Sequence, residues 1–304
     1  MIARQAIANR HGVLFMLGAM ATFSFSDFMV KLAAQRIGIG ELMTIRGVMS
    51  LALLGVVFAL RPEPSVGQAF RSRPALLRSA LEAGVSVSII AALAVLPLGD
   101  CAVVPQTAPL LLTFYLMATG GERRDPTRLA LVVVGLIGVM LIVKPTGSFQ
   151  PEMLYLIASA LLIAGRDLAT RGIPRHISSL ATTMVTTVAN LVTGVGLSAA
   201  QTWAMPDLPT FGALFGSAVA LTAGYLCTIA AFREAEPSVV APFRYTGVLY
   251  ALVIGYFAFG HLPDASAAVG IACIVAAGVP RSCASGRGPA SKKRRPPPPD
   301  VWPR

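Results

Sequence analysis

Long apolar runs alternate with short polar turns along most of the chain, and few charged residues lie inside the runs. A helix needs about 20 apolar residues, at ~1.5 Å each, to cross about 30 Å of hydrocarbon. Turn-forming residues such as Pro62, Pro145 and Pro206 separate the runs. The pattern predicts an all-α polytopic membrane protein with ten transmembrane helices, at residues 13–34, 41–60, 75–97, 101–119, 128–144, 152–170, 178–200, 209–232, 238–259 and 264–280.

Composition supports the membrane class. Of the 304 residues, 55% are hydrophobic and 13% are charged, whereas soluble domains carry roughly a quarter charged residues. The cysteines Cys101, Cys227, Cys273 and Cys283 show no metal-binding spacing, so neither a metal site nor a cofactor is expected.

The basic residues give the predicted orientation. Most of the 25 Lys and Arg residues fall in one alternate set of loops and in the tail, whereas the opposite set holds only Lys31, Arg36 and Lys144. By the positive-inside rule, both termini are expected in the cytoplasm. The net charge of +11 therefore does not indicate a nucleic-acid partner. Residues 281–304 are predicted to form a disordered basic tail close to anionic lipid.

Two segments of the chain repeat each other. Asp27 and Lys31, four residues apart, close the first predicted span, and Asp167 and Arg171 close the sixth in the same way. Each half contains five predicted spans, an odd number, so the second half is expected to be inverted relative to the first. The predicted repeats are residues 12–144 and 151–280. Inverted repeats are typical of alternating-access transporters, whose substrate site lies near the midplane between the halves.

With these motifs the chain resembles the EamA family of the drug/metabolite transporter superfamily over nearly all of residues 12–280. The resemblance implies a ten-helix carrier for small organic metabolites (amino acids, vitamins or nucleoside-like compounds) or drugs in the bacterial inner membrane. Where the family repeats a Gly-Glu pair, this chain keeps Glu122 but has His261 at the second position. The resemblance is carried by Asp27, Lys31, Glu41, Arg46, residues 92–98, Pro109, Gly121, Glu122, residues 230–237, Ala241, Pro242, Gly270 and Gly278.

One candidate substrate site consists of charged residues within the first two spans. An ionisable group at the bilayer centre costs about 2.5–3.5 kcal/mol on insertion scales, so its presence requires a reason. Asp27, Lys31 and Arg46 could line a central cavity and bind a carboxylate or a zwitterion. The alternative is a structural ion pair of Asp27 with Arg46 or Lys31, with Lys31 extending to the interface.

A second candidate group lies where prolines interrupt the fourth and ninth spans. Gln106 and Thr107 follow Pro105, and Arg244 and Tyr245 follow Pro242, at matching positions of the two halves. Freed backbone carbonyls and an arginine would together suit an anionic group. The alternative pairs Arg244 with a carboxylate at a helix end, such as Glu82.

Asp27 and Glu82 are the candidates for binding a coupling proton. For Glu82 the alternative is an interfacial ion pair with Arg78, one turn away. The neighbouring charges Arg166 and Asp167 are interpreted as structural, because they lie at a helix end.

These features favour a secondary carrier rather than an enzyme. The chain contains no GxxxxGK[ST] motif for ATP, no HExxH motif and no credible nucleophile–base pair. The alternatives are an intramembrane enzyme or a lipid-linked sugar flippase. The expected partners are a small-molecule substrate and membrane lipid, and a homodimer is left open.

Overall fold

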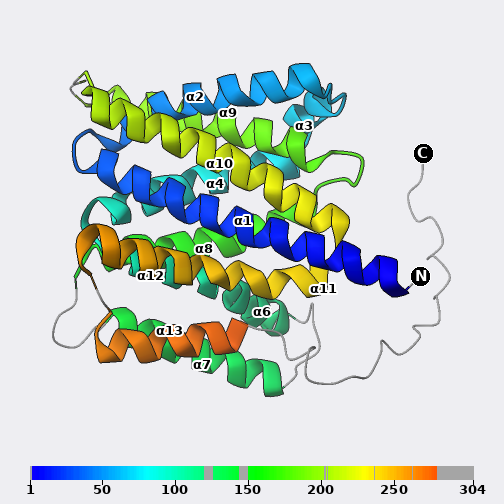
Figure 1. Cartoon of the computed structure of the whole chain (residues 1–304), viewed down its shortest axis with the longest axis vertical. Helices are drawn as coiled ribbons and strands as arrows, with labels where there is room; N and C mark the ends of the chain where they lie inside the picture. The colour runs from blue at the N-terminus through cyan, green and yellow to red at the C-terminus, as the bar shows by residue number, and fades with distance from the viewer. Residues whose placement is uncertain are drawn as a thin grey trace.

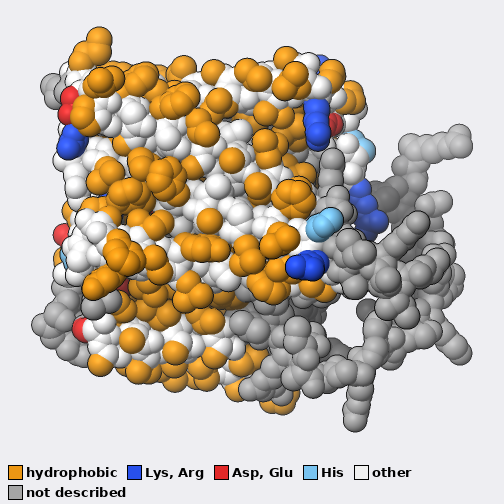
Figure 2. Space-filling view, viewed as in Figure 1, with side chains coloured by type: hydrophobic (Ala, Val, Ile, Leu, Met, Phe, Trp, Pro, Cys, Tyr) orange, Lys and Arg blue, Asp and Glu red, His pale blue; other side chains and the backbone are white. Residues whose placement is uncertain are grey.

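The computed structural model describes residues 2–119, 126–143, 150–201, 203, 205–235, 237–261 and 263–278, and all regular elements within these ranges are helical. The helices lie side by side along a common direction, and successive long helices run in alternating directions (Figure 1). Hydrophobic side chains cover the face shown in Figure 2 from end to end, while the charged ones gather at the two ends. This distribution is that of a protein embedded in a bilayer.

The first half of the chain contains eight helical elements, of which two are α-helices of only six residues and one is a short 3-10 helix. Their bounds are α1 Ile2–Ala34, α2 Ile39–Leu60, α3 Val66–Arg71, α4 Arg73–Val95, α5 Leu98–Val103, η1 Val104–Thr107, α6 Ala108–Ala118 and α7 Pro126–Val143.

The second half repeats this order without a counterpart of α3. Its elements are α8 Met153–Thr170, α9 Ser179–Ser198, α10 Leu208–Glu234, α11 Pro237–Val240, η2 Ala241–Tyr245, α12 Thr246–Phe259 and α13 Ala265–Gly278. Side-chain caps fix two helix starts, because Ser178 accepts from the Ala181 N–H and Asp207 accepts from the Thr210 N–H.

The predicted spans coincide with apolar helices. Seven described helices are long and apolar enough to cross a bilayer, and three shorter apolar helices occupy the remaining predicted positions. The membrane class is therefore right, and the count of ten spans stays a prediction. The six-residue α3 was not anticipated, because it lies in a polar loop. Glu122 and the tail at 281–304 lie outside the described residues.

Helix pairing joins the two halves throughout the bundle. α1 packs along α10 and α8 packs along α4, while α2 pairs with α9 and α7 with α13. In the repeat, α1 corresponds to α8, α4 to α10, α2 to α9 and α7 to α13. Exchanging the halves therefore converts the α1–α10 pair into the α8–α4 pair and leaves the other two pairs unchanged. The pairing is therefore that of two structurally equivalent repeats, with no half that packs mainly on itself.

Glycines permit the closest approaches between these helices. Gly84 of α4 faces Leu162 of α8, and Gly224 of α10 faces the ring of Phe23 in α1. A Cβ at Gly138 of α7 would lie 2.7 Å from the carbonyl oxygen of Gly270 in α13. Small residues let membrane helices pack closely, which matters because lipid provides no hydrophobic driving force between them.

We expect Gly138→Ala to destabilise the α7–α13 contact by about 1–3 kcal/mol, because the added methyl group would overlap backbone. The measurement is thermal unfolding of the purified protein in detergent, seen as a lower Tm. Gly55→Ala is the matched control, because nothing lies within 4 Å of a Cβ there. Equal Tm values for the two variants would contradict the expectation.

Candidate substrate site

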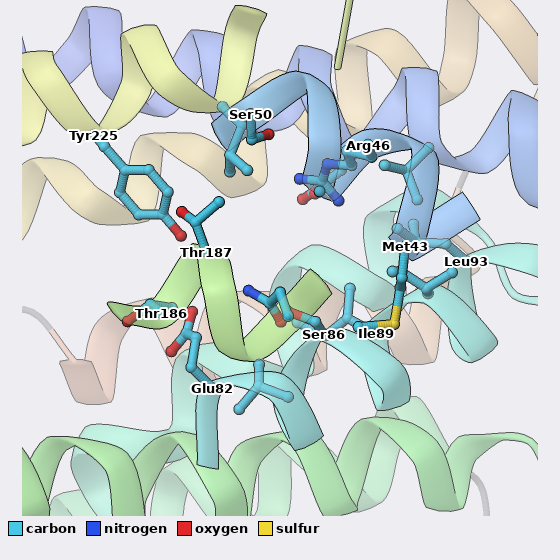
Figure 3. A pocket seen from close by; sticks show the side chains of 17 residues that line it. Met43, Arg46, Ser50, Glu82, Ser86, Ile89, Leu93, Thr186, Thr187 and Tyr225 are labelled. Carbon is cyan, nitrogen blue, oxygen red and sulfur yellow. The ribbon is translucent and has the colours of Figure 1, made fainter. Parts of the chain in front are cut away.

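A cavity of about 140 Å³ lies between α1, α2, α4, α9 and α10, so both halves contribute to its wall. Its volume is roughly ten times what one water molecule requires. α4 contributes the apolar side chains of Val85, Ile89, Ile90 and Leu93 to its wall, together with Glu82 and Ser86 (Figure 3). The polar side chains that line it are Asp27, Arg46, Ser50, Glu82, Ser86, Thr186, Thr187, Asn190 and Tyr225.

Two groups of opposite charge, the carboxylate of Asp27 and the guanidinium of Arg46, line this cavity, and both can form further hydrogen bonds. The carboxylate of Asp27 accepts no hydrogen bond within the described part of the chain, and no ion pair shorter than 4 Å joins it to Arg46. The guanidinium of Arg46 donates through Nη2 to the hydroxyl of Ser26 at 3.4 Å. Ser26 in turn bonds Ser217 of α10 at 3.0 Å. The direct Asp27–Arg46 ion pair, which the sequence left open as an alternative, is therefore not formed, although each group feels the charge of the other.

Three buried polar atoms in the cavity wall have no partner among the described residues: Nε of Arg46, Oγ of Ser50 and Oδ1 of Asn190. Nearly all buried polar atoms in proteins are hydrogen-bonded, so each exception needs an explanation. Three exceptions gathered in one cavity, beside the carboxylate of Asp27, indicate a site that a polar ligand completes.

Glu82 closes one side of the cavity through an ion pair with the second half. Its Oε2 accepts from Nη1 of Arg166 at 2.7 Å, and Arg166 also donates to Oδ1 of Asp167 at 2.8 Å and 3.0 Å. Arg78 instead donates to the hydroxyl of Thr186 at 2.8 Å. Glu82 therefore pairs with neither Arg78 nor Arg244, the two partners considered from the sequence. The structural interpretation of Arg166 and Asp167 agrees with this geometry.

Lys31 does not line the cavity, although it lies one turn from Asp27 on α1. Its ammonium donates to the backbone carbonyls of Leu93 and Leu96 at the end of α4. The structure thus gives Lys31 neither a substrate-facing position nor an exit to the interface.

The second predicted group also lies outside this cavity. The two proline-interrupted segments do meet, because Nε2 of Gln106 donates to the backbone carbonyl of Arg244 at 3.4 Å. Thr107 is buried, and its hydroxyl donates to the Val104 carbonyl at 2.7 Å. Tyr245 is buried and the side chain of Arg244 is exposed. These four residues are brought together in the fold, separate from Asp27 and Arg46.

Several neutral residues that line the cavity were not predicted from the sequence, because they carry no charge. The spacing between Asp27 and Asp167 equals that between Ser50 and Asn190, so these two are equivalent positions of the repeats. Polar residues at equivalent positions of apolar spans were the available signal. Tyr225 carries no such signal; its ring packs edge-on against Phe23, with centroids 5.5 Å apart.

Among the described residues, no cluster of three His, Cys, Asp or Glu is placed to bind a metal ion.

A helical membrane bundle of two equivalent repeats with a polar cavity between them is the architecture of a small-molecule carrier. Residues 10–144 and 150–279 each match the model of the EamA-like transporter family, and the chain belongs to that family. The resemblance seen in the sequence is thereby confirmed.

Two characterised relatives are similar over most of their length. The S-adenosylmethionine uptake transporter of Rickettsia prowazekii is 26% identical over 270 residues, covering 88% of this chain and 90% of the relative. The pseudopaline exporter CntI of Pseudomonas aeruginosa is 26% identical over 273 residues, covering 88% and 94%. A crystal structure with a TM-score of 0.61 and 15% identity covers 91% of this chain and 99% of its own. That last likeness concerns the fold alone.

Proposed function

We propose that this protein is a secondary carrier that moves a small organic metabolite by alternating access, and that the cavity around Asp27 and Arg46 binds this substrate. The observation that carries the proposal is the set of unpartnered buried atoms of Arg46, Ser50 and Asn190 in one cavity. The relatives include one uptake transporter and one exporter. They support the transport of a small molecule.

The chemistry of the wall favours a substrate that carries both charges. The carboxylate of Asp27 and the carbonyl of Asn190 offer acceptors to a cationic amine, whereas the guanidinium of Arg46 offers Nε to a carboxylate or another anion. Apolar side chains such as Ile89 and Leu93 on α4 would contact the uncharged part of the molecule.

The proposed topology has ten spans in two inverted repeats, residues 12–144 and 151–280, with both termini in the cytoplasm of a bacterium and the bundle in its inner membrane. It is supported by the alternating helix directions and by the basic residues in one set of loops. Lipid would be the only other partner that this topology requires.

For coupling, the geometry favours Asp27 over Glu82 as the group that exchanges a proton for the substrate. Glu82 is already held by Arg166 at 2.7 Å, while Asp27 lines the cavity and its carboxylate accepts no hydrogen bond from the part of the chain that the structure describes. Protonation of Asp27 would remove the charge that holds the amine, so substrate and proton would compete for one group.

The test is uptake and counterflow in proteoliposomes with a panel of amino acids, vitamins and nucleosides, with and without a pH gradient. We expect saturable transport of at least one compound that carries both charges, and transport that depends on the pH gradient. Transport of none of these compounds by folded protein, together with lipid scrambling or hydrolysis in the same vesicles, would overturn the proposal in favour of a flippase or an enzyme.

A further inference from the structure

Lys31 is almost entirely buried, at 3% exposure, and its ammonium joins three helices at the end of the bundle opposite the N-terminus. Nζ donates to the carbonyl of Leu93 at 2.9 Å and to that of Leu96 at 2.6 Å. The same Nζ lies 5.3 Å from the ring centroid of Phe259, the last residue of α12.

The reason for these bonds is the proline that follows α4. In a continuous helix the Leu93 carbonyl would accept from the N–H of residue 97, but Pro97 has none. A cation is also favoured at a helix C-terminus, where carbonyls are left without partners. Lys31 supplies the missing donor from α1, and α1 and α4 pack together. We call this set of bonds the Lys31 latch.

The second half contains the parts of the same latch but does not assemble them. Arg171 stands four residues after Asp167, as Lys31 does after Asp27, and Pro237 follows α10 as Pro97 follows α4. Pro237 leaves the Arg233 carbonyl without its helical donor. Arg171 is nevertheless exposed, and its side chain makes no hydrogen bond or ion pair within the described residues.

The packing of the helices shows the same difference. α1 and α4 are in contact, whereas α8 and α10, the equivalent pair in the second half, make no comparable contact among the described helices. The two repeats therefore differ in conformation at their corresponding ends: the first half forms these bonds and this helix contact, and the second half does not. In an inverted-repeat carrier, the opposite-facing state is obtained when the two halves exchange their conformations.

We propose that Lys31 and Arg171 are equivalent positioning residues that are engaged alternately: Lys31 closes one end of the carrier in this state, and Arg171 bonds the carbonyls at the end of α10 in the opposite state. The inference rests on the proposed function, because the exchange has a purpose only in a carrier. It removes Lys31 from the substrate-binding group and gives Arg171 a role.

The chain contains a natural reporter for the Lys31 latch. Cys101 in α5 is 5% exposed and belongs to the same buried cluster as Val30, Leu93 and Leu96. Opening of the latch would let this cluster separate, so the thiol would become accessible to a maleimide. The experiment uses the full chain in vesicles with Cys227, Cys273 and Cys283 replaced by alanine, and it follows the rate at which Cys101 is labelled.

We expect Lys31→Met to raise the labelling rate of Cys101 at least tenfold, and Lys31→Arg to restore it to within about threefold of the parent. We expect Arg171→Gln to lower the rate at least threefold, because it weakens the state in which the Lys31 latch is open. Arg175→Gln is the matched control for Arg171→Gln, because Arg175 is also exposed in the same connection. It should leave the rate unchanged.

A residue that only stabilises the fold would give a different result. If Lys31→Met exposes Cys101 by general unfolding, Lys31→Met would also label a re-introduced Cys227, and Arg171→Gln would not slow the labelling of Cys101. Either of these results, or an unchanged rate in Lys31→Met, overturns the latch. Labelling is measured without substrate, so a labelling result that overturns the latch does not bear on the proposal that the protein is a carrier. Latch-dependent labelling in a protein that transports none of the compounds would contradict the carrier proposal and not the latch.

Discussion

Asp27→Asn is expected to weaken substrate binding by about 10–100-fold and to remove transport that is coupled to a pH gradient. The amide keeps the size of the side chain but loses the charge that would hold a cationic amine. A hydrogen bond to a charged group contributes about 1.5–3 kcal/mol, and about 1.4 kcal/mol corresponds to a tenfold change in affinity. The measurement is the Kd and the uptake rate for the compound identified in proteoliposomes.

Arg46→Gln is expected to weaken substrate binding by a similar factor, because it removes the charge that would hold the anionic group of the substrate. The two effects can be separated with substrate analogues: one that lacks the amine should bind Asp27→Asn and the parent equally, and one that lacks the anion should do the same for Arg46→Gln.

A matched pair of control variants exists on the protein surface. Arg36 and Asp207 form an ion pair of 2.9 Å with side chains 55% and 56% exposed, and such exposed pairs contribute little. Arg36→Gln and Asp207→Asn should therefore transport normally. Normal affinity in Asp27→Asn and Arg46→Gln as well would show that the cavity is not the substrate site.

The second large effect concerns stability. Arg166→Gln is expected to destabilise the protein by about 3–5 kcal/mol, because it leaves a buried carboxylate without its partner. The side chains of Arg166 and Glu82 are only 15% and 13% exposed. The measurement is the Tm of the purified protein in detergent.

Glu82→Gln should be the milder substitution, because Arg166 keeps its bonds to Asp167. The double variant should lose less stability than the sum of the single losses, since neither charge is then left alone. A lower Tm for Glu82→Gln than for Arg166→Gln would contradict this account of the network.

The sequence was most informative where the cause of structure is local. Apolar length and turn-forming residues predicted the positions of the helices, and the scarcity of ions in the spans pointed to Asp27 and Arg46. The position of Lys31 outside the cavity could not be predicted for a physical reason: its partners are backbone carbonyls at the proline-terminated end of α4, a helix that is distant in sequence. Ser50 and Asn190 were missed because they carry no charge, and charge within the spans was the signal that pointed to Asp27 and Arg46.

The pairing of α1 with α10 has a consequence for how the chain is made. The hydrogen bond between Ser26 and Ser217 spans 191 residues, which a ribosome adds in roughly 10–40 s at about 5–20 residues per second. During that time α1 is in the bilayer while the helix that covers its polar face does not yet exist. Until that helix is made, serine hydroxyls can donate to carbonyls of their own helix. A second charged side chain in α1 would instead be exposed to lipid during this time. Biogenesis as well as transport therefore restricts which polar groups this first helix can carry.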